Sequence, residues 1–274
     1  MELNQKYENL KNLISDLGSV AIAFSGGVDS TFLAKVCEDV LGDKAIVVTA
    51  TSSTYPQREF KESKQLATDI GIKQIVIESE ETEIEGFSSN PPNRCYYCKH
   101  ELFSKVKKVA DENNVKYILD GSNYDDIGDF RPGMHAAKEL GVISPLKQVE
   151  LTKDDIRVLS KKLGLPTWEK PAFACLSSRF PYGEEITPKK LSMVDKAEEY
   201  LRGLGFNQFR VRHHGKIARI EIEVSEMHKF LELDFGMVSK ELKKIGFIYV
   251  TLDLTGYRTG SMNEVLSEEQ KKLN

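Results

Sequence analysis

The chain has 274 residues, of which 40% are hydrophobic and 29% charged, and its net charge is −4 at neutral pH. This composition is that of a folded protein long enough for two modest domains, and it does not favour nucleic-acid binding. No apolar run could span a membrane and the polar N-terminus lacks a signal peptide, so we expect a cytoplasmic protein that engages no membrane and no nucleic acid. Its four cysteines should then remain thiols.

Strands and helices alternate over the first part of the chain. Continuous apolar strands are expected at residues 19–24, 45–50, 74–77 and 115–120. Amphipathic helices are expected at residues 3–16, 30–41, 58–70, 99–112 and 152–163. Fully apolar strands separated by helices predict an α/β fold, a doubly wound parallel sheet buried on both faces. We assign residues 1–165 to this domain.

The pattern changes at about residue 166, where several prolines interrupt the chain. A helix is expected at 187–204, followed by a hairpin of strands at 208–213 and 218–224, a helix at 226–244 and a strand at 247–252. A β-β-α-β unit after a helix predicts a second, smaller α+β domain, to which we assign residues 166–274.

The first strand leads into the segment Ser25-Gly26-Gly27-Val28-Asp29-Ser30. A strand, a tight glycine turn and a helix N-terminus can bind phosphate through converging backbone N–H groups. No Gly-Lys-Ser/Thr closes the loop, so it is not a Walker motif. It resembles the SGGxDS pyrophosphate loop (PP-loop) of the ATP pyrophosphatase superfamily, whose members cleave ATP to AMP and pyrophosphate. The alternative is an ordinary turn between a strand and a helix with a serine cap.

Several residues around this loop are candidates for binding ATP. Pyrophosphate binding is assigned to Ala23, Ser25, Gly26, Gly27, Asp29 and Ser30, and Asp29 is also a candidate Mg²⁺ contact. Thr49 and Ser52, at the end of the second strand, are expected to face the nucleoside. Gly121 follows the fourth strand and either faces the same crevice or forms a plain turn. The acidic loop with Asp125, Asp126 and Asp129 either binds metal or is simply exposed.

The cysteines fall into two kinds. Cys37 lies on the apolar side of a helix and is expected in the core. Cys95 and Cys98 form a C-x-x-C pair immediately before a helix, where the pKa of a thiol is lowered. Cys175 lies in a loop about 80 residues further on. A structural zinc site formed by these three cysteines and His100 is the alternative to a chemical role.

Four segments together resemble one family. They are Ser25–Ser30, the C-x-x-C pair, Ala-Cys-Leu-Ser-Ser-Arg-Phe-Pro-Tyr-Gly-Glu at 174–184, and Gly-Tyr-Arg-Thr-Gly-Ser-Met-Asn at 256–263. The chain is similar nearly end to end to the LarE family, ATP-dependent sulfur transferases that build the nickel-pincer nucleotide cofactor of lactate racemase. The resemblance implies adenylation of a carboxylate of a pyridinium biscarboxylate mononucleotide, and then replacement of the AMP by sulfur to give a thiocarboxylate.

The resemblance also implies a sulfur source. Some family members sacrifice the sulfur of the cysteine that matches Cys175. Others carry three cysteines and resemble enzymes with a 4Fe-4S cluster held by three ligands. Cys95, Cys98 and Cys175 stand in the matching places, which favours the cluster. The expected cofactors are therefore ATP, Mg²⁺ and a 4Fe-4S cluster, with Cys175, Cys95, Cys98 and Asp29 as catalytic residues.

The second domain offers arginines for the phosphate of a mononucleotide substrate. Arg179, Arg210 and Arg212 are the candidates, and the last two alternate along a strand so that both face one side. The alternative is a solvated strand face on which they pair with Glu221 and Glu223. Expected partners are a small-molecule nucleotide, other enzymes of the cofactor pathway and further copies of this chain. Other functions that remain open are tRNA thiolation, an amidating ligase such as NAD or GMP synthetase, and a zinc-stapled nucleotide sensor.

Overall fold

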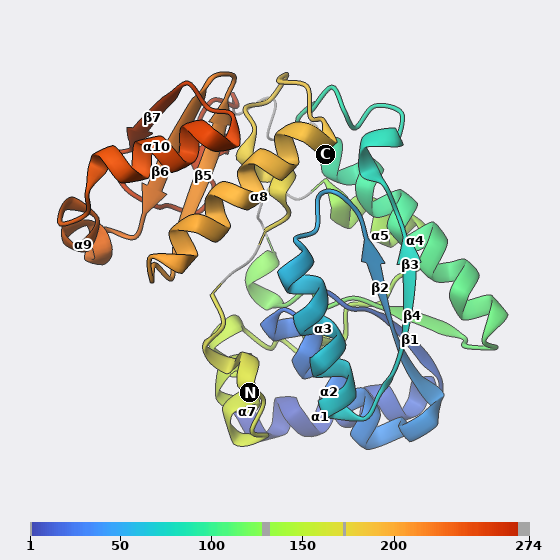
Figure 1. Ribbon diagram of the computed structural model, residues 1–274. Coiled ribbons are helices and arrows are strands. Elements are labelled where there is room, and N and C mark those ends of the chain that lie inside the picture. Colours follow the sequence, from blue (N-terminus) through green and yellow to red (C-terminus); the bar gives the residue numbers. More distant parts are fainter. Residues whose placement is uncertain (1, 128–131, 172–173, 268–274) are drawn as a thin grey trace. The chain divides into compact units, whose positions relative to one another are not determined.

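The computed structural model describes residues 2–127, 132–171 and 174–267 (Figure 1). Two compact units make up the chain. Unit 1 comprises residues 1–80 and 93–173, and unit 2 comprises residues 81–92 and 174–273. Each unit is built around its own sheet and is described separately below.

A four-stranded parallel sheet forms the centre of unit 1, in the order β3-β2-β1-β4 (Figure 1). The strands are β1 (Val20–Ala23), β2 (Ala45–Thr51), β3 (Lys73–Glu78) and β4 (Tyr117–Leu119). The helices are α1 (Leu3–Leu17), α2 (Val28–Leu41), α3 (Gln57–Ile70), α4 (Arg94–Glu112), α5 (Gly133–Glu139), α6 (Pro145–Gln148) and α7 (Lys153–Lys162). The predicted doubly wound α/β fold is confirmed.

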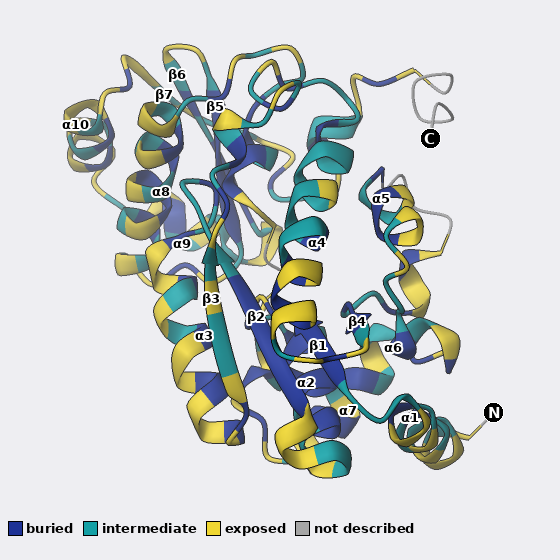
Figure 2. Ribbon diagram, turned by 90° about the vertical axis from the view of Figure 1, so that its right-hand side faces the viewer, coloured by how far each residue is buried: buried dark blue, intermediate teal, exposed yellow. Residues whose placement is uncertain are grey.

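Side chains that alternate along β1 and β2 form two hydrophobic cores, one on each face of the sheet. Val20, Ile22 and Val47 pack on one face with apolar residues of α1, α2, α3 and α7. Ala21 and Ile46 pack on the other face with residues of α4 and α5. Figure 2 shows β1 and β2 as buried, whereas the edge strand β3 is partly exposed. Successive side chains of a strand point to opposite faces of the sheet, and helices cover both faces here. Consecutive residues of the central strands are therefore buried, which explains the unbroken apolar runs in the sequence.

Unit 2 contains a three-stranded sheet in the order β5-β6-β7. The strands are β5 (Phe209–His214), β6 (Ile217–Ile222) and β7 (Tyr249–Leu252), and the helices are α8 (Pro188–Gly203), α9 (Met227–Leu231) and α10 (Phe235–Ile245). β5 and β6 are antiparallel, and β6 and β7 are parallel. One apolar cluster joins α8, α10 and the sheet. The predicted smaller α+β domain is confirmed.

Two helix predictions are wrong in their boundaries. The helix expected at 226–244 is divided into α9 and α10, because the Asp234 side chain accepts a hydrogen bond from Met237 N (3.1 Å) and so caps a new helix. The helix expected at 99–112 begins earlier, at Arg94. Cys95 and Cys98 therefore lie inside α4, in its first turn or just beyond, rather than before it.

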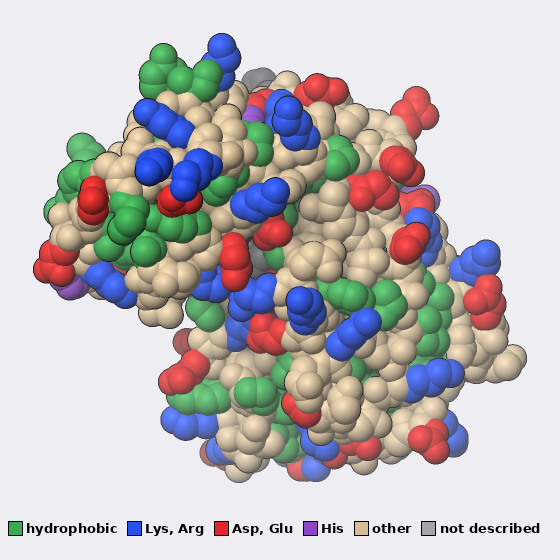
Figure 3. Space-filling view, viewed as in Figure 1, with side chains coloured by type: hydrophobic (Ala, Val, Ile, Leu, Met, Phe, Trp, Pro, Cys, Tyr) green, Lys and Arg blue, Asp and Glu red, His purple; other side chains and the backbone are tan. Residues whose placement is uncertain are grey.

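The surface carries both signs of charge. On the face shown in Figure 3, Lys and Arg side chains lie among Asp and Glu side chains on both units. Within residues 2–127, 132–171 and 174–267, no helix has the length and apolar character needed to cross a membrane.

Candidate functional site

The segment between β1 and α2 is a tight loop that only glycine can form at its centre. Gly26 has φ +65°, and a Cβ there would lie 3.1 Å from Ser63 Cβ and 3.2 Å from Ser63 Cα on α3. The positive φ favours glycine, and the contact with the α3 backbone leaves no room for a side chain. The loop therefore rests directly against α3.

Two serines close the loop at the start of α2. The Ser25 and Ser30 hydroxyl oxygens are 3.2 Å apart, and Ser30 Oγ also donates to Gly27 O (3.3 Å). Thr31 N donates to Gly27 O (3.0 Å), so the N–H groups of residues 28–30 come before the first backbone bond of the helix. Such N–H groups at a helix N-terminus favour an anion.

Asp29 has two partners that come from distant parts of the chain. Its Oδ2 lies 2.5 Å from Lys153 Nζ, and its Oδ1 accepts from Asn123 Nδ2 (3.3 Å). Sequence reasoning missed Lys153. The signal that could have found it is the capping box of Thr152 and Asp155, which fixes Lys153 as the first residue of α7. If Mg²⁺ took the place of the Lys153 ammonium, Asp29 would provide one carboxylate ligand to the ion. One protein carboxylate suits a Mg²⁺ ion that bridges phosphates.

Gly121 packs against the same helix end. A Cβ on Gly121 would lie 3.1 Å from Ser30 N and 3.3 Å from Ser30 Cα. Its backbone approaches the first turn of α2, and no flexible side chain is there to move aside.

Replacing Gly121 by alanine should therefore displace the first turn of α2. We expect a loss of about 1–3 kcal/mol in the free energy of unfolding, as in other overpacked sites, together with weaker ATP binding. Urea unfolding and calorimetric titration with ATP measure the two effects. Gly203→Ala is the matched control, because a Cβ at that helical position meets no atom within 4 Å. Equal behaviour of the two variants would contradict this explanation.

The other residues assigned to ATP lie on or just beyond β1 and β2, and they differ in burial and in hydrogen-bond partners. Thr49 is 1% exposed, and its hydroxyl donates to Phe24 O (2.9 Å) and accepts from Gln74 Nε2 (2.8 Å), which ties β2 to the end of β1 and to β3. Ser52 Oγ accepts from Thr54 N (3.2 Å) in a local turn just beyond β2. Ala23 is the last residue of β1.

The acidic loop after β4 is held by its own hydrogen bonds. Asp126 accepts from Asn123 N (3.0 Å), and Asp125 accepts from Lys153 N (2.8 Å). Asp126 thus shapes the loop that carries Asn123, and Asp125 ties this loop to the start of α7, where Lys153 lies. Asp129 lies outside the described residues.

The four cysteines are thiols with different exposure. Cys37 is fully buried in the core of unit 1, as predicted, and burial strongly raises its pKa. Cys95 and Cys98 are half-buried on α4, three residues apart and so on one side of the helix. Cys175, in unit 2, is exposed. Among the described residues, no group of three or more His, Cys, Asp or Glu side chains is arranged to hold a metal ion.

A buried arginine fixes the backbone beside Cys175. Arg179 is 0% exposed, and its Nη1 donates to Ala174 O (2.7 Å) and Cys175 O (3.1 Å). Its other two nitrogens hold the Glu198 carboxylate in a bidentate pair at 2.8 and 2.9 Å. Burial alone would raise the pKa of Glu198, but the Arg179 guanidinium holds it below its usual value. In this structure Arg179 positions the Cys175 loop.

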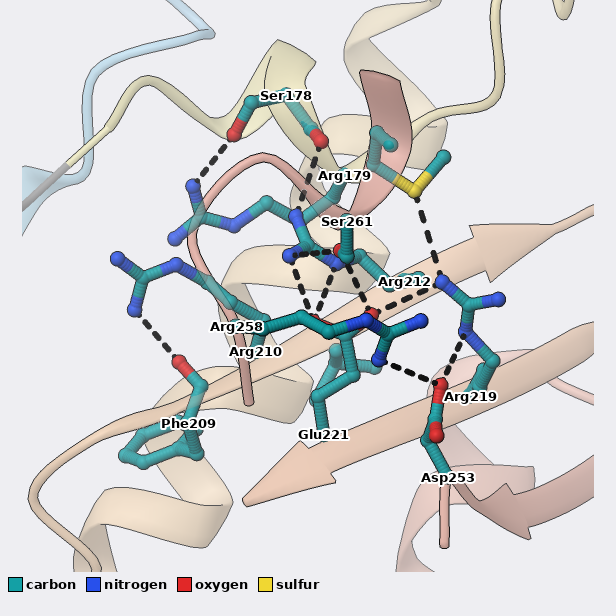
Figure 4. A network of polar contacts seen from close by, with 12 residues as sticks. Ser178, Arg179, Phe209, Arg210, Arg212, Arg219, Glu221, Asp253, Arg258 and Ser261 are labelled. Carbon is teal, nitrogen blue, oxygen red and sulfur yellow. Dashed lines mark hydrogen bonds and ion pairs between the residues drawn. The ribbon is translucent and has the colours of Figure 1, made fainter. Parts of the chain in front are cut away.

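Arg212 belongs to a polar network on the sheet of unit 2 (Figure 4). It contacts Glu221 Oε2 through Nε (2.9 Å) and Nη2 (2.6 Å), and it also donates to Ser261 Oγ (2.8 Å) and Ser178 O (3.1 Å). Its pairing with Glu221 matches the alternative interpretation, except that Arg212 and Glu221 are buried rather than solvated.

Arg210 lies near this network but contacts different groups. Its Nη1 donates to Phe209 O (2.6 Å), and its guanidinium lies 5.1 Å from the centre of the Tyr257 ring. Burial, followed by the charge of Arg179, lowers the pKa of Arg210 to about 10. The charge of Glu198 acts in the opposite direction and raises the pKa of Arg210.

Comparison with known proteins finds several relatives of this chain. The NAD synthase family matches residues 2–114. An uncharacterised protein of Synechocystis sp. is 45% identical over 97% of this chain and 100% of its own length. A component of the glutamine-hydrolysing GMP synthase of Archaeoglobus fulgidus is 28% identical over 66% of this chain and 63% of its own.

Another relative carries a functional name. The pyridinium-3,5-bisthiocarboxylic acid mononucleotide synthase of Lactiplantibacillus plantarum is 39% identical over 98% of this chain and 97% of its own length. The similarity extends over nearly the whole length of both chains. The chain therefore belongs to the LarE family of ATP-dependent sulfur transferases.

Proposed function

We propose that the chain adenylates a carboxylate of a pyridinium biscarboxylate mononucleotide and converts it to a thiocarboxylate. The observation that carries this proposal is the presence, in one chain, of a PP-loop and an exposed cysteine on a loop anchored by Arg179. The 39% identity to a pyridinium-3,5-bisthiocarboxylic acid mononucleotide synthase supports this choice of substrate.

The first step is carboxylate activation. A substrate carboxylate oxygen attacks the α-phosphorus of ATP, and the bond from that phosphorus to pyrophosphate breaks. Negative charge develops on the leaving pyrophosphate, where the N–H groups of the PP-loop and the start of α2 can stabilise it. Lys153 places a cation next to Asp29. We assign to it the stabilisation of the negative charge that develops on the leaving pyrophosphate. Asp29 would be the protein contact of Mg²⁺.

The second step is sulfur transfer. A sulfur nucleophile attacks the acyl carbon, and the carbon–oxygen bond to AMP breaks. If Cys175 is the source, its thiolate first forms a thioester; loss of its Cα proton and cleavage of its Cβ–S bond then release the thiocarboxylate and leave dehydroalanine. The exposure of Cys175 gives its thiol the access that this attack needs.

A 4Fe-4S cluster is the other source that we propose, and the one that the three cysteines favour. Cys95, Cys98 and Cys175 would hold it, since three thiolates are a suitable donor set and two of them lie on one side of α4. When bound, the cluster would supply a sulfide from outside the protein and so spare Cys175.

Pyrophosphate release tests the first step directly. Protein purified without oxygen should release pyrophosphate from ATP when the pyridinium biscarboxylate mononucleotide is added, and mass spectrometry should detect the thiocarboxylate. Iron and acid-labile sulfide at about four each per chain would support the cluster, and zinc in their place would contradict it. The absence of substrate-dependent pyrophosphate release would refute adenylation.

A further inference from the structure

Two backbone carbonyls of the PP-loop are held by side chains from outside the loop. Tyr55 Oη, from the segment between β2 and α3, donates to Ser25 O (2.8 Å). Lys170 Nζ, from the segment after α7, donates to Gly26 O (3.0 Å). Tyr55 and Lys170 lie far apart in the sequence, and both belong to unit 1.

These contacts determine where two N–H groups of the loop point. In a trans peptide the C=O and the following N–H point in opposite directions within one plane, and the described residues contain no cis peptide bond. Holding Ser25 O therefore directs the N–H of Gly26 away from Tyr55, and holding Gly26 O directs the N–H of Gly27 away from Lys170. Within the described part of the chain, no hydrogen bond from either N–H to another group is found.

The surroundings of Lys170 suit a positioning role better than phosphate binding. Its ammonium also contacts Glu59 Oε2 (2.8 Å) and Glu62 Oε1 (2.9 Å), and its side chain is only 11% exposed. Three contacts account for the three N–H donors of an ammonium group. Since two carboxylates surround one cation, the site as a whole offers no positive charge to a phosphate.

The groups around Lys170 are themselves held in place, and the Tyr55 phenol is protonated. Glu59 is 2% exposed on α3 and also contacts Arg58, and Arg157 of α7 donates to Lys170 O (2.9 Å). Burial raises the pKa of the Tyr55 phenol well above its usual value, so its hydroxyl remains a donor at any physiological pH. The loop is thus braced by α3 and by the segment that follows α7.

We propose that Tyr55 and Lys170 are positioning residues that aim the N–H groups of Gly26 and Gly27 at the β- and γ-phosphates of ATP. This inference rests on the proposed function, because it assumes that the loop binds the pyrophosphate portion of ATP. It adds two residues that do not belong to the loop motif and that touch no reacting atom.

Calorimetric titration of the full chain with ATP, inorganic pyrophosphate and AMP tests the inference. Tyr55→Phe and Lys170→Met should each weaken the binding of ATP and pyrophosphate about tenfold, because a misdirected N–H loses a hydrogen bond to a charged oxygen. The affinity for AMP, which lacks these two phosphates, should stay within about twofold. Lys170→Arg should restore part of the loss, since it keeps a cationic donor.

A matched control and the opposing outcomes make the test decisive. Lys35→Met removes another ion-paired lysine, one that contacts Glu38 and Asp39 of α2 and not the loop, and it should bind all three ligands normally. Unchanged ATP affinity in both Tyr55→Phe and Lys170→Met would overturn the inference, and so would an equal loss for AMP and ATP. If the unmodified chain itself bound neither ATP nor pyrophosphate, the proposed function would fail instead.

Discussion

Replacing Cys175 by alanine should abolish thiocarboxylate formation while ATP cleavage continues. The thiol of Cys175 is exposed on the anchored loop, whereas the PP-loop that binds pyrophosphate is built from β1, α2 and their neighbours. Removing a nucleophile or an essential cluster ligand typically lowers the rate of its step by about three orders of magnitude or more. We therefore expect pyrophosphate to be released in the first turnover at a rate close to that of the unmodified protein, while AMP stays bound to the substrate as the acyl-adenylate.

Parallel assays of pyrophosphate and thiocarboxylate measure this separation. The matched control is Cys37→Ala, which removes a buried thiol in the core of unit 1 and should leave sulfur transfer intact. Loss of both activities in Cys175→Ala would show that Cys175 also takes part in activation, contrary to the division of roles proposed above. Protein recovered after one turnover adds a second measurement, because a sacrificial cysteine leaves dehydroalanine, about 34 Da lighter than cysteine.

Replacing Arg179 by methionine should strongly destabilise unit 2. The change leaves the Glu198 carboxylate buried without its bidentate partner. Breaking one side of a buried ion pair typically costs about 3–5 kcal/mol. The same change removes the donor that holds Ala174 O and Cys175 O, so sulfur transfer should fall even at temperatures where unit 2 is still folded.

Hydrogen exchange is the suitable measurement, because two units need not unfold together. Val211 N donates to Glu198 Oε1 (3.1 Å) in the centre of unit 2, so its exchange reports on this site. Arg179→Met combined with Glu198→Leu should recover much of the stability and none of the loop anchoring. Arg258→Met is the control, since its pair with Glu264 is at the surface and should contribute about 0–1 kcal/mol. Similar effects for Arg179→Met and Arg258→Met would contradict the argument.

The sheet of unit 1 could be predicted because its signal is local. Four short apolar runs separated by helices are compatible with few arrangements other than a parallel sheet covered on both faces. The burial of Cys37 follows in the same way from its place on the apolar side of α2. The break between α9 and α10 was missed because the apolar period continues across Asp234, and a cap of about 1 kcal/mol was enough to divide the helix.

The residues that brace the site could not be predicted from local patterns. Lys153, Lys170 and Tyr55 reach the PP-loop from three separate segments. A capping box places Lys153 at the start of α7, but no local pattern shows that any of the three side chains contacts the loop. The arginines of unit 2 stand out in the sequence as candidates for anion binding. The pairing of Arg212 with Glu221 was one of two open interpretations, because both residues lie on strands of one predicted hairpin. The pairing of Arg179 with Glu198 of α8 depends on the tertiary structure and was not predicted.

The two units are interleaved along the chain, and this limits how the protein can be made or divided. Residues 81–92 are synthesised before the second half of unit 1 but belong to unit 2. There the buried Asn90 side chain donates to Pro181 O (2.6 Å), and Gly183 N donates to Asn90 O (2.9 Å). During translation this segment must wait for about 90 further residues before its partners leave the ribosome. A fragment that ends near residue 171 would expose an amide side chain evolved for burial. The enzyme cannot be divided at one peptide bond into two intact halves.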